Sequence, residues 1–125
     1  MRAKKEQGRR MSDCIFCKIA SGEIKSDIVY KDENVVAFND IAPQAPTHLL
    51  LIPRRHVESL QDLSTKDRTE LVSNVFEAIG KIVATKLEGG NGYRVVLNQG
   101  PDAGQAVPHI HFHLLSGRVF AWPPG

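Results

Sequence analysis

The stretch His109-Ile110-His111-Phe112-His113-Leu114-Leu115 alternates imidazole and apolar side chains. In a β-strand, successive side chains point to opposite faces of the sheet. The three histidines therefore share one face, while Ile110, Phe112 and Leu114 share the other. We expect the apolar set to face the core and the histidines to line an accessible surface. Because three of the chain's five histidines fall in this alternation, the stretch indicates a functional site.

Two chemistries fit three imidazoles on one face. Neutral histidines can bind zinc and leave a coordination position open. Alternatively, one histidine can act as a nucleophile while its neighbours stabilise negative charge. The preceding loop, residues 98–108, favours the second, because its glycines and the amides of Asn98 and Gln105 can donate hydrogen bonds to an anionic substrate. No carboxylate follows Asp102, and a hydrolytic metal site would ordinarily add one as a general base.

The rest of the chain predicts a mixed α and β domain. Apolar and β-branched runs bounded by turn residues predict strands at residues 28–30, 35–38, 48–52, 93–97 and 109–115. A long helix should begin after Ser64, whose hydroxyl can cap it, and continue to Gly89-Gly90. A short helix is expected from Cys14 to Ala20. The predicted fold class is α+β, a mostly antiparallel five-stranded meander with one long and one short N-terminal helix.

Composition limits the classes of function. The chain has 125 residues and a net charge of +2, which suits one domain and argues against a dedicated nucleic-acid binder. No apolar run is long enough to cross a membrane, and no export signal is visible, so we expect a cytoplasmic protein. Basic residues crowd the N-terminus, and we expect residues 1–11 to form a disordered tail and residues 12–125 a single domain.

The histidine stretch resembles the signature of the histidine-triad (HIT) nucleotide-binding family. Further segments are similar to its Hint branch, the nucleoside phosphoramidases. These segments are Phe38-Asn39-Asp40-Ile41, Pro43-Gln44-Ala45-Pro46-Thr47-His48, Ile52-Pro53-Arg54-Arg55-His56, Gly104-Gln105 and Trp122-Pro123-Pro124-Gly125. The resemblance covers nearly everything from Cys14 to the end, and it implies a HIT-like fold.

The resemblance implies a reaction centred on His111. Its Nε2 would attack the α-phosphorus of a nucleoside phosphoramidate or an aminoacyl nucleotide, and water would then hydrolyse the covalent nucleotidyl-histidine. The other implied catalytic residues are His109, His113 and His48. For Nε2 to carry a lone pair, neutral His111 must donate its Nδ1–H to a backbone carbonyl. This chemistry requires no metal.

The resemblance also implies a purine nucleotide as substrate. Asp40 is similar to the acidic residue that accepts both ribose hydroxyls. The other implied substrate-binding residues are Ile15, Phe16, Ile19, Ile24, Ile41, Asn98, Gly104, Gln105, Ala106, Val107 and Trp122. For each of the apolar residues around the base, ordinary core packing is the alternative.

Two further features bear on the implied reaction. The family usually forms a homodimer in which the two sheets join, and this would bring Trp122 near the partner's site. Ala106 is a departure, because the family commonly has Ser or Thr at this position. The chain therefore lacks a hydroxyl that would donate a hydrogen bond near the scissile bond.

Cys14 and Cys17 have the spacing of a zinc knuckle, although a full site needs four ligands. Some bacterial-type HIT relatives complete such a pair with the histidine of a Pro-x-x-His segment and the first triad histidine. Here those residues are His56 and His109, so the resemblance implies a structural zinc site. Two reduced cysteines at the start of a helix are the alternative.

Two other functions stay open. A dinucleoside polyphosphate hydrolase belongs to the same family, but the Trp-Pro-Pro-Gly ending speaks against it. A non-catalytic protein that senses nucleotides or binds a partner would keep the pocket without the reaction, and Ala106 favours that interpretation.

Overall fold

The structure is a computed structural model that describes residues 13–87 and 91–125. The expected N-terminal tail and the Gly89-Gly90 helix end fall on or beside the gaps, outside the described residues. The helices and strands are α2 (Ile15–Ser21), β1 (Ile28–Lys31), β2 (Val35–Asn39), β3 (Thr47–Pro53), α3 (Thr65–Thr85), β4 (Tyr93–Leu97) and β5 (Phe112–Ser116). Short 3₁₀ turns span Leu60–Asp62 and Pro101–Ala103. No helix within the described ranges has the length and apolar character needed to cross a membrane.

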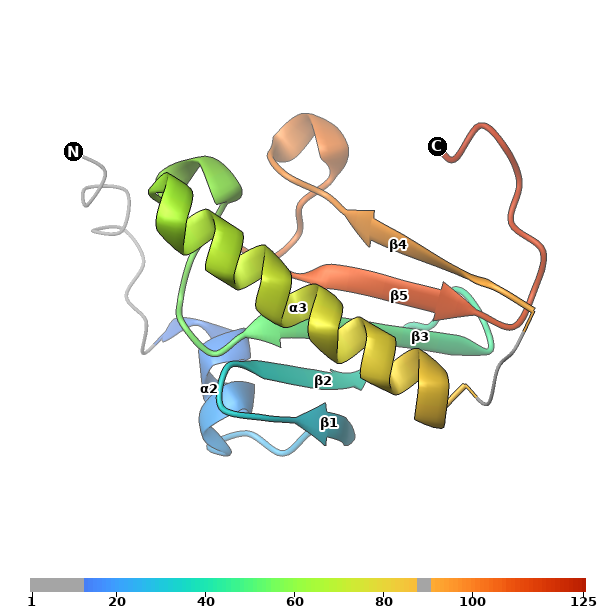
Figure 1. The fold of residues 1–125 in the computed structure, drawn as a ribbon, viewed down its shortest axis with the longest axis horizontal. Helices are drawn as coiled ribbons and strands as arrows, with labels where there is room; N and C mark the ends of the chain where they lie inside the picture. Colours follow the sequence, from blue (N-terminus) through green and yellow to red (C-terminus); the bar gives the residue numbers. More distant parts are fainter. Residues whose placement is uncertain (1–12, 88–90) are drawn as a thin grey trace.

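The strands form one antiparallel sheet in the order β1-β2-β3-β5-β4 (Figure 1). The α+β class with five antiparallel strands and one long helix is therefore confirmed. A simple meander is wrong beyond β3, because β5 lies between β3 and β4. Leu114 of β5 has no exposed surface. A strand this apolar is stabilised more in the centre of the sheet than at its edge, where β4 lies.

Helix α3 crosses one face of the sheet and builds the main core (Figure 1). The Ser64 hydroxyl accepts a hydrogen bond from the Asp67 N–H at 3.1 Å, so the predicted cap is present. The helix ends at Thr85, before the predicted glycine pair. Its apolar stripe packs on residues of the sheet, and the buried set includes Leu71, Val75, Ile79, Ile82, Leu49, Leu51, Ile110 and Leu114.

Helix α2 builds a second core on the opposite face of the sheet. Phe16 and Ile19 pack there against apolar residues of β2 and β3. Those residues are Val36, Phe38, Leu50 and Ile52. Since β2 and β3 are apolar on both faces, the sheet needs a cover on each side. His113 of β5 and the preceding His109 and His111 lie on this second side, where Phe16 of α2 packs against His109 and His111.

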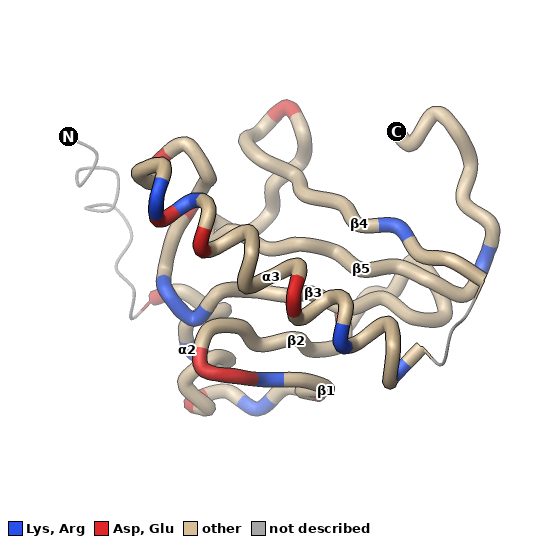
Figure 2. Tube along the Cα trace, viewed as in Figure 1, with Lys and Arg blue, Asp and Glu red and all other residues tan. Residues whose placement is uncertain are grey.

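Charges along α3 are mixed. Figure 2 shows basic and acidic residues following one another on this helix, without a face of one sign. Lys66 and Glu70 are one helical turn apart, and Lys66 Nζ lies 4.0 Å from Glu70 Oε2. This pattern is typical of a solvated helix surface.

Candidate functional site

All five histidines of the chain lie in one row along the side of the sheet that α2 covers. The ring centroids of His56 and His109 are 5.1 Å apart, and those of His111 and His113 are 5.3 Å apart. The row continues from His113 to His48 across 5.1 Å. The structure therefore brings together the three histidines of the stretch 109–115 and the two from other segments. The strand expected at 109–115 is wrong at its start, because β5 begins at Phe112 and only His113 of the three lies in it.

The row is more buried than the alternation of side chains predicted. His109 has no exposed surface and His111 is 5% exposed, whereas His113 is partly exposed. Phe16 of α2 is the cause, because its ring packs edge-on at 5.8 Å from His109 and 5.1 Å from His111. The predicted accessible histidine face is therefore wrong for His109 and His111 and holds only toward His113.

The ring of His109 faces two cysteines. Its Nδ1 lies 3.4 Å from Cys14 Sγ and 3.6 Å from Cys17 Sγ, and His56 Nδ1 lies 3.3 Å from Cys17 Sγ. Zinc bonds of about 2.3 Å to sulfur and about 2.0 Å to nitrogen give a tetrahedron with S···N edges of about 3.5 Å. The four ligand atoms lie within 4.8 Å of one another, so these residues fit a tetrahedral metal site.

The protonation states at this end also suit a metal. His109 Nε2 lies 2.9 Å from the Pro53 carbonyl, which can only accept, so Nε2 carries the proton and Nδ1 offers its lone pair to the cysteine side. Burial lowers the pKa of His109 to about 4, which keeps the ring neutral. Burial and the neighbouring Cys14 raise the pKa of the Cys17 thiol to about 12. Two adjacent thiolates would therefore need a cation between them.

The ring of His109 has no nitrogen left for a substrate, which argues against the expectation that it is a catalytic side chain. Both ring nitrogens face protein groups, and the ring is fully buried. Its backbone carbonyl accepts a hydrogen bond from His111 Nδ1 at 2.8 Å. Nδ1 of His111 therefore carries the proton, and Nε2 carries the lone pair.

At the other end of the row, the hydrogen bonds all run in one direction. The Gln44 N–H donates to His48 Nδ1 at 3.0 Å, so His48 carries its proton on Nε2. That Nε2 lies 2.9 Å from His113 Nδ1 and 3.4 Å from Asp40 Oδ2. His113 Nδ1 is thus an acceptor, and the neutral ring carries its proton on Nε2.

The pKa values agree with neutral rings at this end. Burial lowers the pKa of His113 to about 4, and the neighbouring His111 and His48 lower it further. Burial also lowers the pKa of His48, although the charge of Asp40 opposes that shift.

Asp40, His48 and His113 could also be considered as metal ligands, since their ligand atoms lie within 4.8 Å of one another. A metal on His48 Nε2 would move the ring proton to Nδ1. There it would oppose the Gln44 N–H, which is itself a donor. This cluster is therefore a hydrogen-bonded chain and not a second metal site.

The glycine-rich loop uses its polar groups internally, which corrects the expected phosphate contact of Gln105. Its Nε2 donates to the carbonyls of Glu58 and Val107 at 3.1 and 3.2 Å, and its Oε1 accepts from the Gly100 N–H at 2.9 Å. The backbone N–H of Gly104 likewise donates to the Pro101 carbonyl at 3.0 Å. Gln105 and Gly104 therefore shape the loop.

Other loop residues keep their surfaces free of such bonds. Ala106 is exposed, and Val107 packs against the second core. The side chain of Asn98 makes no hydrogen bond with any residue in 13–87 or 91–125. Its amide could therefore bind a ligand.

The residues expected around a nucleoside divide into two groups. Phe16 and Ile19 are each 6% exposed and belong to the second core, as the packing alternative predicted. Ile15, Ile24 and Ile41 are 47%, 36% and 98% exposed. Such exposure gives an apolar ligand surface to contact, and a folded core does not require it.

Two further residues expected to bind substrate, one acidic and one aromatic, are at least partly exposed. The side chain of Asp40 is 19% exposed, and its Oδ1 accepts from the Ala42 N–H at 2.8 Å. Trp122 of the C-terminal segment is 81% exposed. Within one chain, Trp122 therefore has little packing to hold it.

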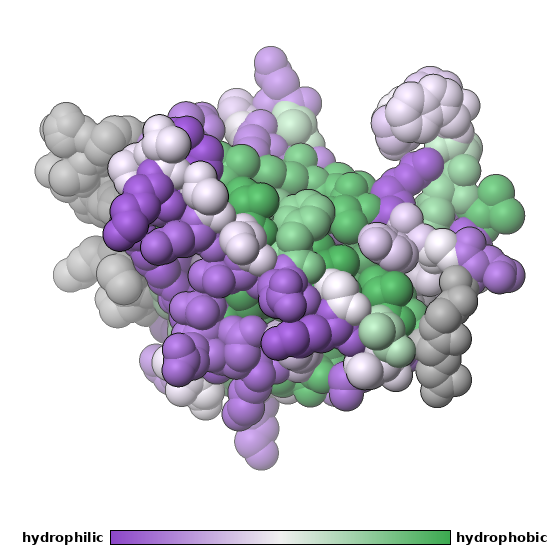
Figure 3. Space-filling view, in the orientation of Figure 1, coloured by the Kyte–Doolittle hydropathy of each residue, from purple (hydrophilic) through white to green (hydrophobic). Residues whose placement is uncertain are grey.

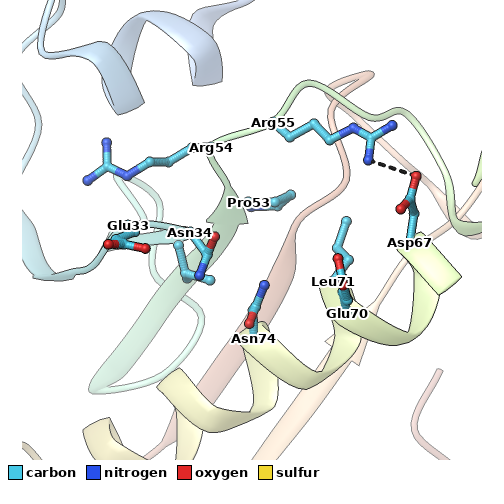
Figure 4. Close-up of a pocket in the computed structure, with 10 residues that line it drawn as sticks. Glu33, Asn34, Pro53, Arg54, Arg55, Asp67, Glu70, Leu71 and Asn74 are labelled. Carbon is cyan, nitrogen blue, oxygen red and sulfur yellow. Dashed lines mark hydrogen bonds and ion pairs between the residues drawn. The ribbon is translucent and has the colours of Figure 1, made fainter.

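Two cavities lie away from the histidine row. One, of about 240 Å³, lies between the β1–β2 turn, the end of β3 and the first turns of α3, where Arg55 pairs with Asp67 at 3.2 Å (Figure 4). The other, of about 720 Å³, lies between the C-terminal end of α3, β4 and the C-terminal segment. Neither is lined by a histidine, so neither offers the chemistry of the row.

Sequence reasoning missed the two groups that hold His48. One is the N–H of Gln44, which lies in a segment quoted only for its family resemblance. The other is Arg118, whose Nε donates to the Gln44 carbonyl at 2.9 Å. No periodic signal joins residues so far apart in the chain, and the contact follows only from the fold.

Comparisons with known proteins agree with this geometry. Residues 21–120 match the HIT domain family. The chain is 45% identical over 129 residues to a 14 kDa zinc-binding protein of Zea mays, with 100% of both chains covered. It is 45% identical over 113 residues to an uncharacterized HIT-like protein of Synechococcus elongatus, covering 90% of this chain and 97% of that one.

A solved structure is similar over nearly its full length. The crystal structure of a HIT family hydrolase from Legionella pneumophila superposes with a TM-score of 0.84 at 47% identity, covering 90% of this chain and 99% of that chain. The family match spans most of the sequence, and the row of histidines lies where the triad signature placed it. The chain therefore belongs to the HIT domain family.

Proposed function

We propose that the protein is a nucleotide hydrolase and nucleotidyl transferase that cleaves nucleoside 5′-phosphoramidates or aminoacyl nucleotides. One observation carries this proposal. The hydrogen bond from His111 Nδ1 to the His109 carbonyl, at 2.8 Å, leaves a lone pair on Nε2 beside the ring of His113. An imidazole held in this tautomer is a nucleophile at neutral pH, and the solved Legionella relative is a HIT family hydrolase.

In the first step, the lone pair of His111 Nε2 forms a bond to the α-phosphorus while the bond from phosphorus to the leaving nitrogen or oxygen breaks. The leaving group keeps that electron pair and takes up a proton. In the second step, water attacks the phosphorus, the P–Nε2 bond breaks, and the water gives up a proton as the nucleoside monophosphate forms. Throughout, the Nδ1–H stays on the His109 carbonyl, which stabilises the positive charge of the substituted ring.

His113 is the residue best placed to stabilise the phosphate. Its Nε2–H is a donor, because Nδ1 already accepts from His48. It is also the most exposed of His109, His111 and His113. We infer that the phosphate approaches His111 from the His113 side, where a neutral N–H can bond a phosphate oxygen as charge develops.

For the nucleoside, we propose a purine base held by the exposed isoleucines and a ribose held by Asp40. Ile15, Ile24 and Ile41 present apolar surface that the core does not use. The carboxylate of Asp40 lies 3.4 Å from His48, so a ribose bonded to it would be near the catalytic row. Trp122, largely exposed, would contact the leaving group in the site of the partner subunit.

We also propose a structural zinc ion held by Cys14, Cys17, His56 and His109. The support is the tetrahedral spacing of the ligand atoms, together with the zinc-binding name of the Zea mays relative. When bound, zinc would balance the charge of two thiolates and join α2 to the segment that enters β5. A reducing compartment, which we take to be the cytoplasm, would keep both cysteines available as ligands.

The protein is further proposed to act as a homodimer. Strand β4 is an edge strand of the sheet, so its outer backbone groups are available for pairing with a second copy. Figure 3 shows apolar surface beside α3, in the part of the view that β4 and β5 occupy. Phe76 and Tyr93, each 49% exposed, belong to these elements.

A turnover panel tests the reaction. Adenosine and guanosine phosphoramidates should be cleaved faster than diadenosine polyphosphates, and His111→Ala should abolish turnover in both. Quenched reactions analysed by mass spectrometry should show a nucleotidyl adduct on the peptide that contains His111. Turnover that survives His111→Ala would refute the proposed nucleophile.

Ala106 favours a second candidate, a non-catalytic nucleotide sensor. The residue is exposed and offers no hydroxyl to the leaving group. If the protein binds nucleoside monophosphates but releases no leaving group from any member of the panel, the sensor is the correct function.

A further inference from the structure

We infer that Arg118 is a positioning residue for the proposed reaction, because it holds the carbonyl of Gln44, the residue whose N–H fixes the tautomer of His48 and the direction of the His113 N–H. This inference rests on the proposed function. It assigns a role to a residue outside the histidine row and outside the proposed nucleoside contacts.

The first link joins the C-terminal segment to the loop before β3. Arg118 Nε donates to the Gln44 carbonyl at 2.9 Å. The guanidinium is itself held at two points. Its Nη1 donates to the Val119 carbonyl at 3.0 Å, and its central carbon, Cζ, lies 4.3 Å from the centre of the Phe120 ring. Arg118 therefore approaches Gln44 in a defined orientation.

A separate feature shows that this segment is pressed against the loop. Gly117 has φ +101°, a left-handed conformation that favours glycine. A Cβ on Gly117 would lie only 2.8 Å from Pro46 Cβ. The chain next to Arg118 thus packs on the same loop that contains Gln44. Pro43 and Pro46 of that loop have no N–H with which to fix it from within.

The second link runs from the backbone of Gln44 to the reaction, through two adjacent peptide groups that meet at the Gln44 Cα. Its carbonyl accepts from Arg118, and its N–H donates to His48 Nδ1 at 3.0 Å. His48 then donates from Nε2 to His113 Nδ1 at 2.9 Å. This leaves the His113 proton on Nε2, directed away from His48.

Reversal of this chain would harm the reaction. If the Gln44 N–H turned away, His48 could carry its proton on Nδ1, and His113 could then donate to it from Nδ1. His113 Nε2 would present a lone pair to the phosphate oxygens in place of an N–H, which is repulsive. Asp40 Oδ2, at 3.4 Å from His48 Nε2, also favours the productive tautomer, so loss of Arg118 should shift the balance without abolishing activity.

The chain offers a matched control for Arg118. The guanidinium of Arg94 also lies against Phe120, at 5.1 Å, and donates to a carbonyl of the C-terminal segment, that of Ala121, at 3.0 Å. Of these two arginines, only Arg118 donates a hydrogen bond to Gln44. Arg94→Ala therefore removes a similar charge and a similar contact to Phe120 and leaves the chain to His48 intact.

The experiment compares Arg118→Ala, Arg118→Lys and Arg94→Ala in steady-state turnover of a nucleoside phosphoramidate. Arg118→Ala should lower kcat by about tenfold, the size of one lost positioning hydrogen bond, with KM changed by less than about twofold. Arg118→Lys should recover part of the rate, because its ammonium can donate to the same carbonyl. Arg94→Ala should keep the wild-type kcat.

A second measurement reports the tautomer directly. Nitrogen-15 spectra of the imidazoles should show His48 Nδ1 unprotonated in wild type and in Arg94→Ala, and a mixture of tautomers in Arg118→Ala. Unchanged tautomers in Arg118→Ala would overturn the inference. An Arg94→Ala variant as impaired as Arg118→Ala would also overturn it, since packing of the C-terminal segment would then be the cause.

The two proposals fail separately. If wild type turns over no substrate, the proposed function is wrong, but the nitrogen spectra of the unliganded protein still decide whether Arg118 sets the tautomer of His48. If Arg118→Ala proves unstable, Arg118→Met, which keeps the aliphatic stem and removes every donor, gives the same decision through its spectra.

Discussion

At the scale of single residues, the backbone sets the protonation of the histidine row. Carbonyl oxygens of Pro53 and His109 fix the protons of His109 and His111, and the N–H of Gln44 fixes that of His48. Each of these partners can play only one role, donor or acceptor. The row therefore contains one ring whose free lone pair suits a metal and one whose free lone pair suits phosphorus.

Ala106 provides a test of leaving-group protonation. The residue is exposed beside the row, in the loop that Gln105 holds together. We predict that Ala106→Ser raises phosphoramidase turnover by about one to two decades, because the hydroxyl would donate a hydrogen bond near the scissile bond. Single-turnover rates with a poor leaving group would reveal the gain most clearly. Unchanged or lower turnover would count against this account of Ala106.

His113 makes the fold sensitive to acid. Its pKa is about 4 in the folded chain, against 6.5 for an unperturbed histidine. As pH falls from 6.5 toward 4, His113 becomes protonated in the unfolded chain but stays neutral in the folded chain. The free energy of unfolding therefore decreases through this window, and it levels off at lower pH, where both states are protonated. Denaturant unfolding at about pH 7.5 and about pH 5 would measure the loss.

His113→Asn is the control for this prediction, because an amide does not titrate. The variant should lose less stability than wild type between the same two pH values, since His109 and His48 are present in both proteins. An equal loss in the two proteins would show that His113 is not a source of the acid sensitivity.

At the scale of elements, α2 connects the proposed metal site with the catalytic row. Cys14 caps the helix, Cys17 lies in its first turn, and Phe16 packs on the rings of His109 and His111. A helix of this length has little stability of its own. Its position therefore depends on the second core and on the residues at its N-terminus.

We predict that Cys17→Ser loosens α2 in the metal-loaded protein. At a free metal concentration of about 100 times Kd, binding stabilises the native state by about 2.7 kcal/mol, and the variant should lose much of this. Hydrogen exchange should accelerate in residues 15–21 while β3 and α3 stay protected. Elemental analysis should show one zinc per chain in wild type. Metal-replete wild-type protein without zinc would exclude the site.

At the scale of the whole molecule, strand β4 leaves one edge of the sheet open to a second copy. We predict a particle of about twice 13.8 kDa by sedimentation velocity. Phe76→Glu should shift it toward the monomer, because Phe76 is half-exposed beside the apolar surface. Ile28→Glu, on edge strand β1, should leave the mass unchanged. A wild-type monomer at high concentration would refute the dimer.

Much of this architecture follows from local patterns in the sequence. Alternation and turn residues predicted the strands, with 93–97 correct at both ends, and Ser64 predicted the start of α3. The strand expected at 109–115 begins only at Phe112, because His109 and His111 bond to groups outside the sheet ladder. The order of β4 and β5 was not predictable, because strand pairing depends on the path of α3 across the sheet. The burial of His111 also escaped prediction, since the same apolar residues of α2 could line a ligand pocket or a second core.

The candidate site shows the same limit. Imidazole alternation identified the row, but the ring of His109 and the amide of Gln105 have partners that only tertiary structure supplies. The contact between Arg118 and Gln44 has no local signal at all.

His109 joins two tasks in a single amino acid, since its ring faces the cysteines while its carbonyl holds the proton of His111. Under the functions proposed above, the supply of zinc would change the turnover rate of the enzyme, although the ion does not contact the nucleotide. A cell short of zinc would then hold poorly tuned copies of this protein, and restoring the nutrient would revive them without new synthesis.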